Sequence, residues 1–93
     1  MNIENNFIPR IIDDDLIGRI SFQGADGSEL VEAACIRVDV DGTPGANDMP
    51  GRIEFHTTSD GSAGATERLR IDSTGIIQVK GDGGNNNKIY GYD

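Results

Sequence analysis

Apolar and polar residues alternate along five short stretches of the chain. In residues 16–22, Ile20 and Phe22 would lie on one side of an extended strand, with Arg19 and Ser21 on the other. A period of two is typical of a β-strand with one buried face. The same alternation predicts four more strands, at residues 34–40, 52–58, 67–73 and 76–80.

The pattern occurs twice, at a spacing of 33 residues. Gly-Arg-Ile-Ser-Phe at residues 18–22 corresponds to Gly-Arg-Ile-Glu-Phe at residues 51–55, and an Ile-Arg-Val-Asp segment corresponds in the same way to Leu-Arg-Ile-Asp. The Asp-Gly pair between these segments is displaced by one residue, and the spacing then recovers. Because such a displacement belongs in a loop, the flanking segments are the structural units. The repetition predicts two copies of one β unit, at residues 16–50 and 51–80.

Residues 28–35 fit either a helical turn or a strand. Their apolar residues have helical spacing, and Ser28 is in position to cap the first turn. The equivalent segment of the second copy, Ser-Ala-Gly-Ala-Thr at residues 62–66, is a poor helix former, so the extended form is favoured. Residues 24–27 are predicted to turn, because Asp-Gly readily adopts positive φ. The fold class predicted is all-β, with short strands and turns.

Segments without the alternation flank the two copies. Residues 1–15 contain Pro9 and end in three consecutive aspartates, and they are predicted to form an extended arm. Residues 81–87 are rich in Gly and Asn, which indicates a loop. Residues 88–92 are predicted to be a short final strand or tail, so residues 81–93 make up the third part of the chain.

The composition favours self-association. With 93 residues, the chain is one small domain, and such domains bury only a modest share of their surface. Apolar residues make up 35% of the sequence, which contains three Phe and two Tyr residues but no Trp. A core this small is expected to be completed by partner chains that pool their apolar surface.

The net charge of −8 argues against two classes of partner. Proteins bind nucleic acids and anionic membranes through a surplus of basic residues, which this chain lacks. No apolar run reaches the length of a membrane-spanning helix, and the first residues lack the basic and apolar regions of a signal peptide. The single cysteine, Cys35, excludes a disulfide framework within the chain.

Candidates for chemistry are few. Asp39 and Asp41 precede Gly42 as in a calcium loop, but the third acid and the distal Glu are missing, so a solvated turn is favoured. His56 is the only histidine, and its equivalent in the first copy is Gln23, which favours a polar surface position over a general base or a metal ligand. Among sixteen acids some carboxylates will pair by chance, which gives no indication of glycoside hydrolysis. We expect no catalytic, cofactor or metal site, and no enzyme activity.

Four segments of the two copies carry a resemblance to a known family. They are Gly-Arg-Ile-Ser-Phe-Gln-Gly-Ala-Asp-Gly at residues 18–27, Val-Glu-Ala-Ala at 31–34, residues 40–52 with their Asn-Asp-Met-Pro-Gly-Arg string, and Thr-Glu-Arg-Leu-Arg-Ile at 66–71. These segments resemble the repeat region of bacteriophage tail fibres and related virion appendage proteins, especially those of marine and cyanobacterial phages. The resemblance implies a trimeric, β-rich shaft or appendage that is built into a virion. It carries no catalytic residue across.

The assembly expected is an intertwined homotrimeric β-prism or a barrel-like structure, which would protect the strand edges. The trimer core would consist of Ile20, Phe22, Ile36, Val38, Ile53, Phe55, Leu69 and Ile71. Interchain ion pairs, for which the planar guanidinium group is suited, would set the register of the chains. Their members would be Arg19, Arg37, Arg52, Arg70, Asp39 and Asp72. Solvated surface charges, worth about 1 kcal/mol per pair at most, are the alternative.

The function expected is that of a structural virion protein, made in the host cytoplasm, that serves attachment or particle architecture in a tail fibre or surface appendage. The partners expected are two further copies, other virion proteins and host-surface polysaccharide. Tyr90 and Tyr92 are candidates for partner contact, and the alternative is that they close the end of the trimer core. Two alternative functions are a capsid decoration or head-fibre trimer, whose N-terminal arm would grip the capsid shell, and a polysaccharide-degrading tail protein.

Overall fold

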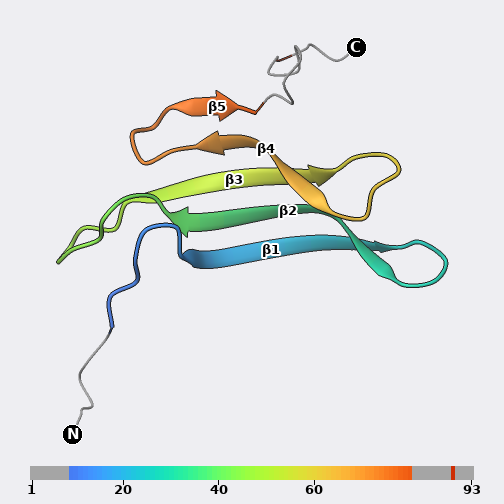
Figure 1. Ribbon diagram of the computed structural model, residues 1–93, viewed down its shortest axis with the longest axis horizontal. Helices are drawn as coiled ribbons and strands as arrows, with labels where there is room; N and C mark the ends of the chain where they lie inside the picture. Colours follow the sequence, from blue (N-terminus) through green and yellow to red (C-terminus); the bar gives the residue numbers. More distant parts are fainter. Residues whose placement is uncertain (1–8, 81–88, 90–93) are drawn as a thin grey trace, which may run out of the picture.

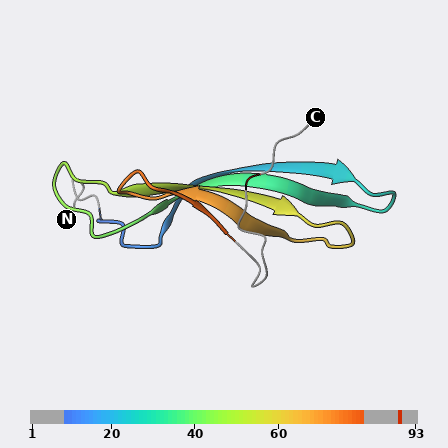
Figure 2. The same ribbon diagram turned by 90° about the horizontal axis from the view of Figure 1, so that it is seen from above.

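The computed structural model describes residues 9–80 and 89, and within these residues it contains strands and no helix. The strands are β1 (Leu16–Ala25), β2 (Leu30–Val40), β3 (Gly51–Thr58), β4 (Ala65–Ile71) and β5 (Ile77–Val79). Each strand pairs antiparallel with the next, giving a five-stranded meander with β1 and β5 at its edges (Figure 1). Figure 2 shows these strands from above as a single twisted layer. The predicted all-β class is confirmed.

The first hairpin is longer than the alternation predicts. The ambiguous segment is extended, because β2 runs without a break from Leu30. The predicted turn at residues 24–27 is wrong by two residues, since β1 continues to Ala25. The Asp26 carboxylate decides where the chain turns, because its Oδ1 accepts hydrogen bonds from the backbone N–H of Ser28 at 2.8 Å and of Glu29 at 2.9 Å.

Asp72 decides where the fourth strand ends. The strand predicted at residues 67–73 is β4, at Ala65–Ile71, because the Asp72 Oδ1 accepts hydrogen bonds from the backbone N–H of Thr74 and Ile76, both at 3.0 Å. Gly75 completes this turn with a φ of 87°, which favours glycine. The fifth strand is consequently shorter than the predicted 76–80 and covers Ile77–Val79.

The two copies of the sequence pattern form two successive hairpins, β1–β2 and β3–β4. An irregularity in the strand pairing lies between Phe22 and Gln23 in the first hairpin and between Phe55 and His56 in the second, 33 residues later. The strand pairs therefore bend at equivalent positions of the two copies.

The cross-strand register nevertheless differs between the hairpins by two residues. Ile20 lies opposite Ile36, whereas its equivalent Ile53 lies opposite Ile71. The reason is the second loop, residues 59–64, which is two residues longer than the first loop, residues 26–29. Because side chains alternate with a period of two, this shift leaves every apolar residue on its original face.

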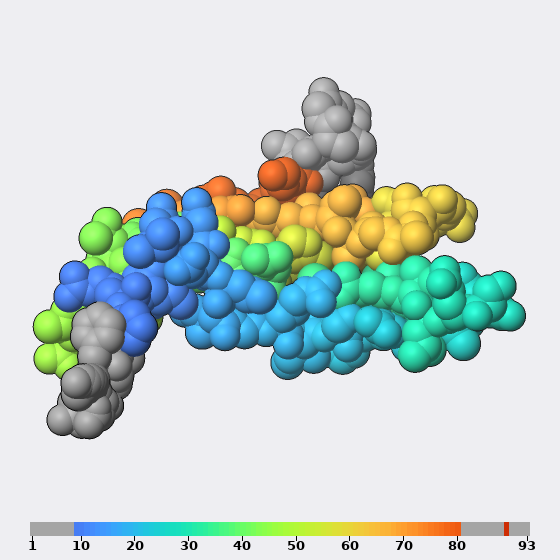
Figure 3. Space-filling model, turned by 60° about the horizontal axis from the view of Figure 1, so that its bottom comes forward, coloured from blue at the N-terminus to red at the C-terminus, as the bar shows by residue number. Residues whose placement is uncertain are grey.

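Residues 9–15 lie against the end of the sheet in the same chain (Figure 3). The Asp14 N–H donates to the Val40 carbonyl at 2.9 Å, and the Val40 N–H donates to the Asp15 carbonyl at 2.8 Å. The Asp13 Oδ1 accepts a hydrogen bond from the Gly42 N–H at 2.8 Å. The described part of the predicted arm thus continues the pairing of β1 with β2, and Val40 beneath it is fully buried.

Candidate functional site

Cross-strand pairing collects the apolar side chains on one face of the sheet, here called the apolar face. Residues directly opposite one another in antiparallel strands share a face. One row across the sheet consists of Ile20, Ile36, Phe55, Leu69 and Val79, and the next of Gly18, Val38, Ile53, Ile71 and Ile77. Phe22 lies two residues beyond Ile20 on the same side. All eight residues predicted for the trimer core are therefore brought together on this face.

The apolar face is uncovered in the described chain. Of the eight predicted core residues, Ile20 and Phe22 are 57% and 50% exposed, and the other six are only half-buried. Ile77, on the same face, is 62% exposed. Among the described residues, the buried hydrophobic side chains are Cys35 and Val40. A β-sheet normally buries one face against another layer. In the described residues no such second layer covers the apolar face.

The opposite face, here called the charged face, is organised around Arg52. Its guanidinium Nε lies 2.5 Å from Glu54 Oε2, and its Nη2 lies 3.1 Å from Asp39 Oδ2. Its Nη1 lies 2.9 Å from Asp14 Oδ1 and 3.2 Å from Asp41 Oδ1. The side chains of Asp39 and Glu54 are only 4% and 6% exposed, because the long arginine side chains lie over them.

The electrostatics of Arg52 follow from this arrangement. Burial alone would lower the pKa of its guanidinium, and the hydrogen bonds to Glu54, Asp14 and Asp41 outweigh burial and raise that pKa. Arg52 is therefore held in the charged form by the four carboxylates that surround it.

Two further arginines pair on the charged face. Arg37 donates from Nε and Nη2 to the two Asp39 oxygens, both at 3.0 Å, and this bidentate hydrogen bonding raises the pKa of Arg37. Arg70 donates to Glu67 at 2.5 Å and 2.9 Å, which raises the pKa of Arg70 and lowers that of Glu67. Each of these arginines is thus paired with carboxylates of the same chain.

The six residues predicted for interchain ion pairs divide into two groups. Arg19, Arg37, Arg52, Arg70 and Asp39 all form ion pairs with groups of the same chain, Arg19 with Glu32. Asp72 contacts no arginine within the part of the chain that the structure describes. Its carboxylate accepts hydrogen bonds from Thr74, Ile76 and Gln78, which lower its pKa to about 2, the Thr74 hydroxyl being the largest cause. Pairing between chains stays a prediction.

His56 belongs to the charged face. Its Nε2 lies 2.9 Å from Glu54 Oε1, and its side chain is only 14% exposed. His56 thus lies on the predicted polar side of its strand and is largely covered there, because the alternation shows which face a residue occupies and not what covers it. Gln23, the equivalent residue in the first copy, is exposed and donates to Ser21 Oγ at 3.3 Å.

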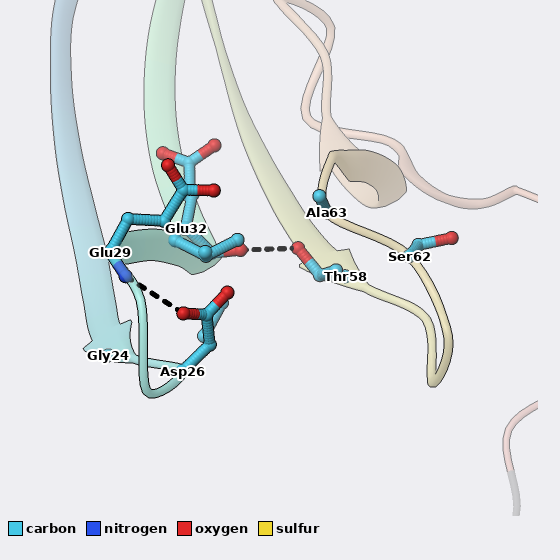
Figure 4. Close-up of a pocket in the computed structure, with 9 residues that line it drawn as sticks. Gly24, Asp26, Glu29, Glu32, Thr58, Ser62 and Ala63 are labelled. Atoms are coloured by element: carbon cyan, nitrogen blue, oxygen red, sulfur yellow. Dashed lines mark hydrogen bonds between the residues drawn. The ribbon is translucent and has the colours of Figure 1, made fainter.

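A cleft of about 380 Å³ lies between the tips of the two hairpins, which stand apart in Figure 3. Asp26, Glu29 and Glu32 line one wall, and Ser62 and Ala63 line the other (Figure 4). Between them, the Thr58 hydroxyl donates to the Glu32 carbonyl at 2.8 Å. The Glu32 carboxylate already binds Arg19 and Ser21. The sequence contains no signal for this cleft, because it arises only when the pairing of β2 with β3 places two distant turns side by side.

Two structural findings bear on metal and membrane binding. Within residues 9–80 and 89, no three His, Cys, Asp or Glu side chains are grouped so that they could hold a metal ion. The same residues contain no helix that is long and apolar enough to cross a membrane. Tyr90 and Tyr92 lie outside the described residues.

No protein-family model matches the sequence, and no curated protein matches it. Solved structures do match, among them the carboxy-terminal domain of the bacteriophage T5 L-shaped tail fibre with its intramolecular chaperone domain. The similarity covers 96% of this chain and 28% of that chain, with a TM-score of 0.63 and 16% sequence identity. This chain thus spans little more than a quarter of the length of the tail-fibre structure that it matches.

At 16% identity, the similarity concerns the fold. It confirms the predicted tail-fibre-like fold. The more specific resemblance to tail-fibre proteins of marine and cyanobacterial phages stays a prediction. The chain has the fold of part of a phage tail fibre.

Proposed function

We propose that the chain is a structural virion protein of a bacteriophage, a component of a tail fibre in which three copies join through their apolar faces. The observation that carries the proposal is the distribution of exposure over the sheet. Acidic residues of the charged face, Asp39 and Glu54, are buried, while Ile20 and Phe22 on the apolar face are about half exposed. A partner chain on the apolar face would bury these apolar side chains as well.

The physical argument for a partner is the hydrophobic effect. Removing apolar surface from water stabilises a protein by about 25 cal/mol per Å², and soluble monomers rarely leave a large contiguous apolar patch exposed. Each row of the apolar face crosses all five strands, so the patch extends over the whole width of the sheet. Three identical patches meeting at an axis would form the core that the single chain lacks.

The structural similarity supports the place of this assembly in a virion. The matching structure is a domain of a phage tail fibre, and it is similar to almost the whole of this chain. The partners in this proposal are two further copies, neighbouring virion proteins and, at the host surface, polysaccharide. In this proposal the role of the described residues is structural and non-catalytic.

Sedimentation velocity on the purified full chain tests the assembly. The expected result is a single species with three times the 9.9 kDa mass of the chain. A monodisperse monomer at micromolar concentration would contradict the proposal. A cryo-EM map of the assembled particle then locates the protein: density in the tail fibres is the expected result, and density on the capsid surface would instead identify a decoration or head-fibre trimer.

A further inference from the structure

The two edge strands of the sheet, β1 and β5, are both open on their outer side in the described chain (Figure 1). All ten residues of β1 are exposed. An exposed edge strand presents unpaired N–H and C=O groups, which readily pair with another strand. Proline, which would block such pairing, is absent from both strands.

The outward-facing groups of β1 follow from the hydrogen bonds of its neighbour. Val40 exchanges hydrogen bonds with residues 14 and 15, immediately before β1, so its backbone groups are directed toward the β1 side. In a strand, this direction alternates from residue to residue, so Val38 and Ile36 are directed the same way. Their partners Gly18 and Ile20 use their own backbone groups to bind β2. The backbone groups of residues 19 and 21, which alternate with these two, consequently point away from the sheet.

The same reasoning applies to β5. The Lys80 N–H donates to the Arg68 carbonyl at 2.8 Å, and the Asp72 N–H donates to the Ile76 carbonyl at 3.0 Å. Residues 76, 78 and 80 therefore direct their backbone groups toward β4, and Ile77 and Val79 direct theirs outward. Each edge of the sheet thus offers a set of donors and acceptors for a further strand.

The two edges are also compatible in direction and in face. Because successive strands are antiparallel, β1 and β5 run in the same direction. Ile20 on β1 and Val79 on β5 belong to the same row of the apolar face. We propose that β1 of one copy pairs in parallel with β5 of the next copy, so that three sheets join edge to edge with their apolar faces inward. This inference rests on the trimer of the proposed function and specifies how its copies are joined.

The geometry of a three-fold ring supports this arrangement. Rotation about an axis preserves the direction of a strand only when the strand is nearly parallel to that axis. The strands would therefore run along the length of the assembly. A sheet of five strands at the usual spacing is roughly 24 Å wide, and the axis of a three-sided prism with such sides lies roughly 7 Å from the middle of each side. This distance is a little more than half the usual spacing of about 10 Å between packed sheets. It suits a large side chain on the middle strand, β3, where Phe55 occupies the apolar face.

Disulfide cross-linking of the full chain tests the proposed edge pairing. In a Cys35→Ser background, Gln78→Cys on β5 is combined in turn with Arg19→Cys, Ser21→Cys or Gln23→Cys on β1. These residues lie on the charged face, at successive positions about 7 Å apart, and a disulfide requires Cα atoms within about 7 Å, so one pair falls within reach. Arg19 is the expected partner if neighbouring copies are not shifted along the strand direction, because it belongs to the same cross-strand row as Gln78.

The expected result is that one double variant, once oxidised, gives covalent dimers and trimers on a non-reducing gel, while the single variants give none. Each variant is first required to sediment as a trimer under reducing conditions. Trimers without a cross-link in any double variant would overturn the edge pairing and leave the proposed function standing. Cross-linking of Ser21→Cys alone would also overturn it, because two β1 strands would then face each other. A monomeric wild-type protein would overturn both proposals.

Discussion

The guanidinium Nη2 of Arg52 on β3 lies 3.1 Å from Asp39 Oδ2 on β2, and the two side chains are 10% and 4% exposed. The equivalent arginine of the first copy, Arg19, is 40% exposed and binds Glu32. The two arginines occupy the same position of the repeat but different positions in the sheet, since β3 is central and β1 is an edge strand. Because strands lie on both sides of β3, Arg52 is largely buried in an ionic cluster, whereas Arg19 on the edge strand stays partly exposed.

Replacing Arg52 is expected to destabilise the chain strongly. Arg52→Met leaves Asp39 and Glu54 buried without their shared counter-ion, and breaking a buried pair in this way costs about 3–5 kcal/mol. Arg19→Met is the matched control, and it is expected to cost about 0–1 kcal/mol because the pair that it removes is partly exposed. Urea unfolding followed by circular dichroism measures both. Equal losses for the two variants would show that the burial of Arg52 has no energetic consequence.

A charge on the apolar face is expected to abolish self-association. Phe22→Glu places a carboxylate in the proposed interface, where it would be desolvated without a partner. Gln23→Glu is the control, since Gln23 is the next residue in the chain and its side chain lies with Ser21 on the opposite face. Both positions are exposed, so neither change is expected to unfold the chain. Sedimentation should give a monomer for Phe22→Glu and a trimer for Gln23→Glu; trimers of both would exclude the apolar face as the interface.

Asp72 is expected to make stability depend on acid pH. Its pKa is about 2 in the folded chain, against about 3.9 for an ordinary aspartate. A lowered folded pKa stabilises the protein above the unfolded value, and this stabilisation is lost as the pH falls through the folded value. The free energy of unfolding should therefore decrease between about pH 4 and pH 2, and Asp72→Asn should remove part of that dependence.

Thr74→Val is a second probe of the same turn, because the Thr74 hydroxyl donates to Asp72 at 2.6 Å and is the largest cause of the lowered pKa. It should weaken the pH dependence less than Asp72→Asn does. Chemical denaturation at a series of pH values measures the three proteins. A wild type and an Asp72→Asn variant whose stabilities change in parallel between pH 4 and pH 2 would contradict the assignment.

Two glycine substitutions are expected to have opposite effects. Gly42 has a φ of 139°, and an added Cβ would lie 3.1 Å from the Pro50 Cγ, so Gly42→Ala should cost about 1–3 kcal/mol. Gly24 has no atom within 4 Å of an added Cβ, so Gly24→Ala should stabilise the chain by about 0.4–1 kcal/mol, because it restricts the unfolded state. Thermal unfolding compares the variants. Stabilisation by Gly42→Ala would show that the loop after β2 relaxes freely.

Local pattern was sufficient to predict strands and faces. Ile20, Phe22 and Phe55 were assigned to one side of the sheet from alternation alone, and the structure places them there. The pattern was insufficient where a side chain terminates a strand, because a hydrogen bond such as that from Ile76 to Asp72 depends on how the turn closes. The cleft lined by Glu32 and Ser62 was also beyond prediction, since its walls are 30 residues apart in the chain.

The sequence by itself determined the all-β class and the separation of apolar from charged residues, because these depend on the two-residue period of an extended chain. Only the tertiary structure decided the register of the second hairpin and the burial of Arg52 and His56. Register depends on the length of the loop that closes each hairpin, and burial depends on which strands lie on either side. Both are properties of strand pairing rather than of any single segment.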